Sequence, residues 1–459
     1  MNAHVSPDDI RTRFSRAMSQ LYRQEVPQYG TLLSLVAEIN AASVAGDADT
    51  RRAMARAGEQ ERLAVERHGA IRLGTPEELA TVCRMFRLMG MHPVGYYDLS
   101  AAGVPVHSTA FRPLAEEALQ ANPFRVFTSL LRLELIDDPA LREAAAAILA
   151  RRRIFTDRAL ALLARGEAEG GLTDVEAAAF VRELLQTFRW HREATVNADT
   201  YRRLHEAHRL VADVVCFKGP HINHLTPRTL DIDAAQAAMS AHGIAAKAVI
   251  EGPPRRRHAI LLRQTSFKAL NEPVQFVDGV PGTHTARFGE IEQRGMALTP
   301  TGRRRYDELL AQARAFATSG EAYEQALAET FAALPDDPAA LHDRDLAFFR
   351  YEIHDEAAFQ AAAHARLPWQ LDALLARQAL IASPILYEDF LPVSAAGIFQ
   401  SNLGEAESRA YRGREAKGVF ESALQATLTD EVELYTAMRA NSLEPLRERY
   451  RTMLQAAHS

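Results

Sequence analysis

The first 66 residues carry apolar side chains at the spacing of amphipathic helices. Ile10, Phe14 and Met18 recur every four positions, and a second run with helical spacing follows a proline break. Polar residues fill the positions between them. The pattern predicts an N-terminal helical cap over residues 1–66.

From Arg67 the pattern changes to short runs rich in β-branched and aromatic residues. The runs lie between glycines and prolines, at 95–99, 104–111 and 124–136, and they predict strands. An amphipathic helix is expected from Thr75, which precedes a proline and two glutamates as a helix cap would. Together they predict a first α+β module over residues 67–137.

A helical block separates this module from a second one. Helix-start signals at Asp138 and Thr173 predict a helical insertion over 138–207. Strand-like runs then resume at 210–217, 258–262, 274–277 and 284–298, which predict a second α+β module over 208–299. Residues 300–459 are expected to be helical, with a strand-containing segment near 383–404.

The two modules share a faint internal repeat. His68 and His224 are each followed four residues later by an arginine, Arg72 or Arg228, and then by a capped helix that ends at a glycine. Two related βαβββ modules explain this better than a solenoid does. The expected fold class is therefore α+β, with paired βαβββ modules forming a central sheet around a metal site and with large helical insertions.

Composition and charge narrow the function classes. The 459 residues include 47% hydrophobic and 24% charged residues with a net charge of −6, which is globular usage without the basic footprint of a nucleic-acid binder. No apolar run approaches the length of a membrane span, and the first ten residues lack a signal-peptide design. Two cysteines, Cys83 and Cys216, fit a reducing compartment and are expected to be buried. We expect a cytoplasmic protein, and no pattern predicts its oligomeric state.

The repeat places two histidines where they could share a metal ion. His68 and His224 occupy equivalent positions, and pairing of the modules would bring their imidazoles together. In the last long run of the second module, Glu290 and Glu292 fall on one face of a strand, where buried carboxylates need a partner or an ion. Glu292 is the predicted third ligand and Glu290 the alternative, because strand parity does not separate them.

Two histidines and one carboxylate form the facial triad of non-haem Fe(II) oxygenases. Zinc and manganese enzymes use the same ligand types, so a lyase, hydrolase or isomerase on this scaffold is the alternative enzyme class. A non-catalytic protein that binds a small anion is the other alternative. His221, three residues before His224, would face the other side of an extended strand and is interpreted as structural or as a residue that supports a metal ligand.

Arg72 lies on the same face of its strand as His68, about 13 Å further along. Its planar guanidinium suits a carboxylate, which predicts that Arg72 binds the far end of an anionic substrate. The alternative for Arg72 is a surface ion pair.

Five stretches resemble the 2-oxoadipate dioxygenase/decarboxylase family, also called hydroxyglutarate synthases, of the vicinal-oxygen-chelate superfamily. They are VERHGAIRLGT (65–75), GMHPVGYYDLSAAGVPVHSTAFRP (90–113), FKGPHINHLTPRTLDID (217–233), ARFGEIEQRGMALTPTGRRRYD (286–307) and FLPVSAAGIFQSNL (390–403). The likeness extends over nearly the whole chain.

This resemblance implies specific roles. His68, His224 and Glu292 fall on the family's metal triad and Arg72 on its substrate-carboxylate contact, while Val393 and Ser394 match a segment that lines the pocket. The implied cofactor is Fe(II). The implied reaction converts the 2-oxo diacid 2-oxoadipate and O2 to 2-hydroxyglutarate, as the D enantiomer, and CO2, in lysine breakdown.

Overall fold

The structure, a computed structural model, describes residues 4–247, 249–267, 270–316, 320–391 and 416–456. The chain forms two compact units. The first comprises residues 1–251, 263–293 and 389–429, and the second comprises 252–262, 294–388 and 430–459. Each unit is described by itself below. Within the described residues, no helix is long and apolar enough to cross a lipid bilayer.

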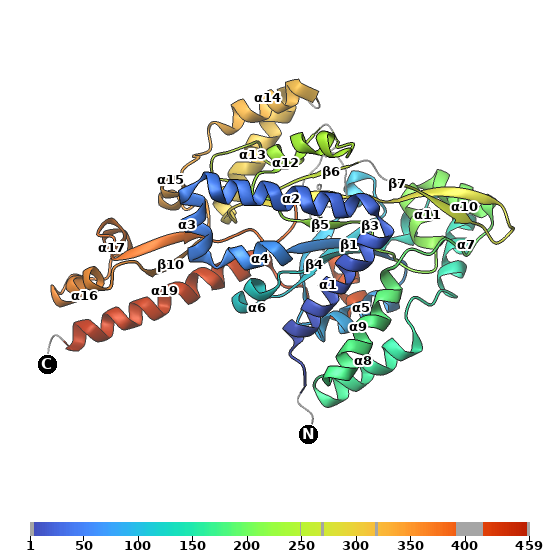
Figure 1. Ribbon diagram of the computed structural model, residues 1–459, viewed down its shortest axis with the longest axis horizontal. Coiled ribbons are helices and arrows are strands. Elements are labelled where there is room, and N and C mark those ends of the chain that lie inside the picture. Colours follow the sequence, from blue (N-terminus) through green and yellow to red (C-terminus); the bar gives the residue numbers. More distant parts are fainter. Residues whose placement is uncertain (1–3, 248, 268–269, 317–319, 392–415, 457–459) are drawn as a thin grey trace. The chain divides into compact units, whose positions relative to one another are not determined.

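A five-stranded sheet forms the centre of the first unit (Figure 1). Its order is β2-β3-β4-β1-β5, in which β1 runs parallel to β4 and the other neighbours are antiparallel. The strands are β1 (Arg67–Leu73), β2 (His92–Asp98), β3 (Val106–Arg112), β4 (Arg125–Leu131) and β5 (Leu225–Pro227). With helix α5 (Pro76–Arg87) between β1 and β2, the first four strands form the predicted βαβββ module.

The second module starts at β5 and continues through α12 (Ile232–Met239), β6 (Leu262–Ser266) and β9 (Glu290–Arg294). Lys247 and Glu251 hydrogen-bond to β6, and β6 pairs with β9. A hairpin of β7 (Leu270–Gln275) and β8 (Pro281–Arg287) is inserted between β6 and β9. The paired-module α+β fold expected from the sequence is thereby confirmed.

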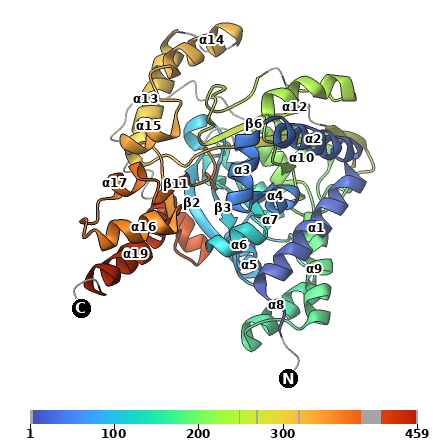
Figure 2. The ribbon, with the colours of Figure 1, turned by 60° about the vertical axis from the view of Figure 1, so that its left-hand side comes forward.

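One face of the five-stranded sheet packs against helices. Ile71 and Leu73 of β1 and Val126 of β4 are buried in one cluster with the apolar face of α5 and with the N-terminal helices. Phe14 of α1 contacts Phe188 of α9 with 5.6 Å between ring centroids, and Figures 1 and 2 show these two helices side by side. Burial of this apolar area supplies the main stabilisation of the unit.

Besides a helical segment at residues 416–424, the described part of the first unit contains further helices. They are α1 (Pro7–Glu25), α2 (Pro27–Gly46), α3 (Ala48–Ala57), α4 (Glu59–Val65), α6 (Glu116–Ala121), α7 (Pro139–Leu149), α8 (Asp157–Glu169), α9 (Asp174–Phe188), α10 (Ala198–Ala207) and α11 (Arg209–Val215), with 3-10 turns η1 (Ser100–Ala102), η2 (Leu133–Leu135) and η3 (Ser240–His242).

The second unit is mostly helical. A two-stranded antiparallel sheet, β10 with β11, packs beside the long C-terminal helix, and Phe359, Leu380 and Tyr450 lie in its core. Its elements are α13 (Pro300–Phe316), α14 (Gly320–Phe331), α15 (Pro338–Asp343), β10 (Phe349–Ile353), α16 (Glu356–His364), α17 (Leu371–Ala376), β11 (Leu380–Pro384) and α19 (Glu431–Ala456).

Three strand predictions in the second module were wrong in detail. The run 210–217 forms helix α11, which His208 caps by accepting from the Leu210 amide, because a short apolar run suits a buried helix as well as a strand. Cys216 therefore follows a helix, although it is buried as predicted. Strand β6 begins only at the end of the predicted run 258–262. The run 284–298 is interrupted at Gly289, where a Cβ would lie 1.7 Å from the Phe267 ring.

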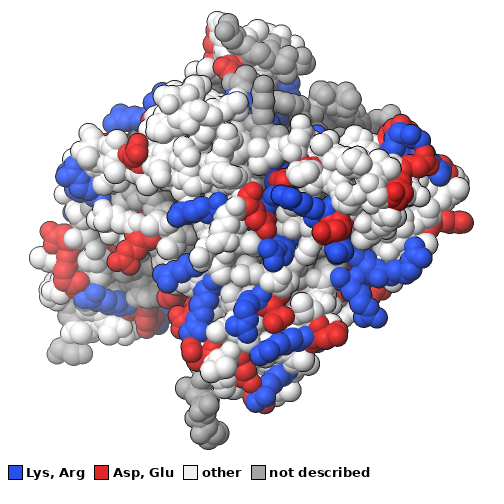
Figure 3. All heavy atoms as spheres, turned by 45° about the vertical axis from the view of Figure 1, so that its right-hand side comes forward, with Lys and Arg blue, Asp and Glu red and all other residues white. Residues whose placement is uncertain are grey.

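Charged side chains are of both signs on the surface. On the face drawn in Figure 3, basic and acidic residues are interspersed. The first unit carries exposed ion pairs, such as Arg84 with Glu167 and Arg13 with Asp174. Such pairs contribute little to stability because water and salt screen them.

A buried charge cluster behaves differently. Glu66, fully buried at the end of α4, accepts hydrogen bonds from Arg62, Arg125 and Arg228 at 2.9 to 3.2 Å. Burial would raise the pKa of Glu66, but the three guanidinium groups outweigh it and hold the pKa well below its usual range. This carboxylate joins α4, β4 and the end of β5.

We expect Glu66→Gln to lower the free energy of unfolding by about 3–5 kcal/mol, since three guanidinium groups would then lack their shared counter-charge. Denaturant unfolding followed by circular dichroism measures the change. The control is Glu167→Gln, which removes an exposed carboxylate and should cost less than about 1 kcal/mol. Equal effects of the two substitutions would contradict a special role for the Glu66 cluster.

Candidate metal centre

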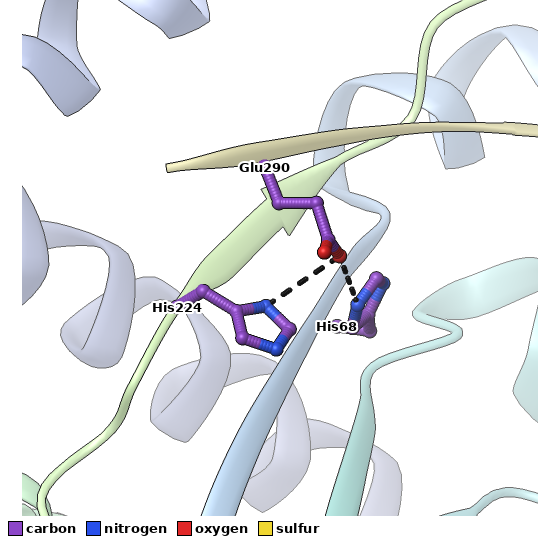
Figure 4. Close-up of side chains that lie close together, drawn as sticks. All are labelled: His68, His224 and Glu290. Carbon is purple, nitrogen blue, oxygen red and sulfur yellow. Dashed lines mark ion pairs between the residues drawn. The ribbon is translucent and has the colours of Figure 1, made fainter. Parts of the chain in front are cut away.

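The site is assembled by strand pairing rather than by proximity in the sequence. His68 lies on β1 and His224 directly precedes β5, and the antiparallel register places His68 opposite Thr226. Just beyond β5, Arg228 pairs in parallel with Glu292 of β9. The pairing therefore brings β1, β5 and β9 together, with His68, His224 and Glu290 turned toward one another (Figure 4).

Gly69 permits the close approach of the segment that carries His224. A Cβ at this position would lie 2.5 Å from the Ile222 side chain and 3.2 Å from the His224 carbonyl oxygen. The Asn223 amide donates to the Ala70 carbonyl at 3.0 Å, which joins the segment to β1 just before β5 begins. A larger residue at 69 would separate the two histidines.

Both glutamates of β9 contact His68, each at a different ring nitrogen. Glu290 Oε1 lies 3.0 Å from Nε2, and Glu292 Oε2 lies 2.8 Å from Nδ1. Glu290 Oε1 is also 3.7 Å from Nδ1 of His224. The two imidazole centroids are 5.2 Å apart, and all four side chains are buried.

Among the described residues, His68, His224 and Glu290 form a group that could hold a metal ion, with ligand atoms within 4.8 Å of one another. The structure thus brings the two predicted histidines together and places Glu290, the sequence alternative, nearest to both. Glu292 contacts the other ring nitrogen of His68, Nδ1.

The surroundings of the two glutamates differ. Glu290 Oε1 accepts from the Thr226 hydroxyl at 3.1 Å and from Gln264 Nε2 at 2.8 Å. Among the described residues, the buried His68 Nδ1 has no well-aligned hydrogen-bond partner, although Glu292 Oε2 is 2.8 Å away. Two atoms bound to one octahedral ion at about 2.1 Å are about 3 Å apart. The contacts of His68 with Glu290 and with Glu292, at 3.0 and 2.8 Å, both match that spacing, so the donor set fits a divalent cation.

The protonation tendencies of the histidines also suit a metal. Burial, with His68 and Arg72 nearby, lowers the pKa of His224 to about 4, which keeps its imidazole neutral and able to bind a cation. Burial alone would lower the pKa of His68, but Glu292 and Glu290 outweigh it and raise the pKa. A cation at the centre would replace this proton as the counter-charge of the carboxylates.

Aromatic side chains cover the centre. Phe390 and Phe288 contact the rings of His68 and His224 at 5.0 and 4.8 Å between centroids. Phe127 packs on Phe390 at 5.3 Å. The chain before Phe390 is fixed by the buried pair of Arg112 with Asp389, which has two contacts of 2.7 and 3.0 Å. Val393 and Ser394, predicted to line the pocket, lie outside the described residues.

Arg72 lies further along β1 on the same face as His68. Its side chain is 24% exposed, and Nη1 donates to Asp213 Oδ2 at 2.7 Å. His221 is buried against the other oxygen of Asp213, at 3.2 Å, rather than in the metal group.

Sequence reasoning missed Asp213 and His284. Asp213 lies on α11, which was predicted as a strand, and His284 Nε2 lies 2.8 Å from Asp213 Oδ1. No sequence motif links them to Arg72. A helix predicted over residues 209–215 would have placed Asp213 on a buried face.

The chain was compared with known proteins. The family model described as 2-oxoadipate dioxygenase/decarboxylase matches residues 14–402. A Pseudomonas putida protein of that name is 57% identical over 451 residues, covering 96% of this chain and 97% of that one. An Escherichia coli protein with the same name is 55% identical over 433 residues, 94% of this chain and 96% of its own.

A solved structure is also similar. The crystal structure of hydroxyglutarate synthase from Pseudomonas putida in complex with 2-oxoadipate aligns with a TM-score of 0.91 and 56% identity. The alignment covers 98% of this chain and 100% of that chain.

Matched substitutions distinguish the two glutamates. If the predicted ligand Glu292 binds the ion directly, Glu292→Gln should weaken binding of one divalent ion at least about 100-fold, because a ligand charge is lost. Glu290→Gln should weaken it by about 10- to 100-fold, as for a residue that orients a ligand. Anaerobic titration with Fe(II) or Co(II) measures both affinities. The reverse order would make Glu290 the ligand and Glu292 the orienting residue.

Proposed function

The chain belongs to the 2-oxoadipate dioxygenase/decarboxylase family, and from this membership we propose that it converts 2-oxoadipate and O2 to 2-hydroxyglutarate and CO2 with one bound Fe(II). Atoms balance, because the six-carbon diacid and O2 together contain the atoms of the five-carbon hydroxy diacid and CO2. The observation that carries the proposal is a family match over most of the chain, together with two buried histidines, His68 and His224, that share a possible metal group with Glu290.

The proposed ligands are His68, His224 and Glu292. The buried His68 nitrogen beside Glu292 supports this choice, and the hydrogen bonds that Glu290 already accepts from Thr226 and Gln264 suit an orienting role. These three residues would hold the ion, which when bound would supply a site for the 2-oxo end of the substrate and the activation of O2.

The protein's own side chains would hold the other end of the substrate. Arg72 shares the sheet face of His68, and its guanidinium is suited to the distal carboxylate of a diacid. An acid with that carboxylate can reach Arg72 while its 2-oxo end is at the metal. This arrangement selects for a diacid of the right length.

Phe127, Phe288 and Phe390 would keep water from the reacting end. The rings of Phe390 and Phe288 pack on the two histidines, Phe127 packs on Phe390, and none of these rings carries a hydrogen-bonding group. Exclusion of water protects reactive species and strengthens the electrostatic contacts within the site.

We also propose the configuration of the product and the location of the protein in the cell. The D enantiomer and a place in lysine breakdown are supported by the sequence resemblance. A cytoplasmic location is supported by Cys83 and Cys216, which are both buried as free thiols.

The activity is tested by loading metal-free protein with Fe(II) under anaerobic conditions, adding 2-oxoadipate and then O2. We expect one CO2 and one 2-hydroxyglutarate for each O2 consumed, with D configuration by chiral chromatography. Metal-free protein should form no product. Turnover with zinc but without O2 uptake would instead support a lyase, hydrolase or isomerase, and stoichiometric binding without CO2 release would support an anion-binding protein.

The role of Arg72 has a separate test. We expect Arg72→Ala to bind the metal normally but to lose roughly ten- to a hundredfold in kcat/KM for 2-oxoadipate, as expected from loss of a charged hydrogen bond worth about 1.5–3 kcal/mol. The matched variant Arg72→Lys, which keeps the charge but not the planar fork, should lose less. Unchanged kcat/KM in Arg72→Ala would show that the distal carboxylate binds elsewhere.

A further inference from the structure

Asp213 is a buried carboxylate that the metal centre does not use. It lies on α11 with 6% of its side chain exposed, between Arg72 on one side and two histidines on the other. Oδ2 accepts from Arg72 at 2.7 Å. Oδ1 lies 2.8 Å from His284 Nε2 and 3.2 Å from His221 Nε2. One carboxylate therefore joins α11, β1, β8 and the segment before β5.

The two histidines that contact Oδ1 of Asp213 are themselves held by aromatic residues. His284 Nδ1 lies 2.8 Å from the Tyr201 hydroxyl on α10. Trp190 stacks parallel to His284, at 6.2 Å between centroids, and meets the edge of His221 at 4.8 Å. Contacts on both imidazoles restrict the carboxylate, so Asp213 is a fixed point rather than a mobile surface partner.

Asp213 is charged under working conditions. Burial would raise the pKa of this carboxyl, but His221, His284 and Arg72 outweigh burial and hold the pKa well below its usual range. A charged acceptor on Nη1 restrains a side chain that has many rotamers. A guanidinium has five N–H donors, so the bond to Asp213 leaves other donors suited to a second carboxylate.

We propose that Asp213 is the positioning residue of Arg72, holding the guanidinium along the sheet face so that it meets the distal carboxylate of the substrate. The inference rests on the proposed function, in which Arg72 binds that carboxylate. Restraint of Arg72 before binding reduces the conformational entropy that the substrate would otherwise have to remove.

The negative charge of Asp213 also opposes an incoming carboxylate. Orientation and charge can be separated by substitution, because asparagine keeps an oxygen for Arg72 while its NH2 group faces the imidazoles. Alanine removes both the charge and the acceptor. If orientation is the main contribution of Asp213, the two variants will differ.

The experiment measures KM, kcat and the anaerobic dissociation constant for 2-oxoadipate and for 2-oxohexanoate, which lacks the distal carboxylate. For Asp213→Ala we expect KM and the dissociation constant for 2-oxoadipate to rise about tenfold, the cost of one unrestrained long side chain. We expect kcat to change less than about threefold and 2-oxohexanoate binding to be unaffected. Asp213→Asn should recover most of the 2-oxoadipate affinity.

A double-mutant cycle tests whether Asp213 acts through Arg72. In the Arg72→Ala background, Asp213→Ala should cause no further loss of affinity for 2-oxoadipate. An additional tenfold loss there, or equal losses for both substrates, would overturn the positioning role while leaving the proposed function intact. An unchanged dissociation constant for Arg72→Ala alone would overturn both the positioning role of Asp213 and the anchoring role of Arg72, whereas the proposed reaction is decided by product formation.

Two further variants guard against a folding effect. If Asp213→Ala does not fold, Asp213→Glu keeps the charge but moves the carboxylate by one methylene, and weaker binding of 2-oxoadipate alone would support the proposal. Unchanged 2-oxoadipate binding by Asp213→Glu would overturn it. Asp174→Ala, which removes an exposed carboxylate paired with Arg13, serves as the matched control and should leave all constants unchanged.

Discussion

The antiparallel pairing of β1 with β5 is the interaction on which the metal centre depends. It joins two modules that are far apart in the sequence and sets the register of His68 against Thr226. His224 then lies beside β1, and the residues after β5 align β9 so that both glutamates face the histidines. A shift of one residue would turn the side chains of β1 to the opposite face of the sheet. The close contact at Gly69 supports this register, because no larger side chain fits between the strands.

Buried carboxylates in the first unit meet two different kinds of cationic partner. Glu66 is shared by Arg62, Arg125 and Arg228, whereas His68 lies between two carboxylates. The first group is balanced by guanidinium groups that are always charged. The second has two carboxylates and only histidines to oppose them, an excess of negative charge that a divalent cation would neutralise. This difference in cationic partners separates the structural Glu66 cluster from the candidate ligand set.

The helical segment before β5 contributes more than a cover for the sheet. It ends in α10 and α11, which supply Tyr201 and Asp213 to the polar cluster around Arg72. The metal group and this cluster lie at two positions on the same strand, β1. The distance between them would set the length of a substrate that binds at both, and Asp213 would hold Arg72 at a fixed position along β1.

The sequence by itself determined the module pattern and the face shared by His68 and Arg72, because strand alternation and helix caps are local properties. It also paired His224 with His68 through the internal repeat. It did not separate Glu290 from Glu292, since residues two apart in a strand share a face. It misassigned 210–217, since a short apolar run satisfies helix and strand alike, and Asp213 was missed with it. Only the tertiary structure decided which nitrogen of His68 each glutamate meets and which carboxylate holds Arg72, because those contacts join residues whose separation along the chain leaves no local pattern.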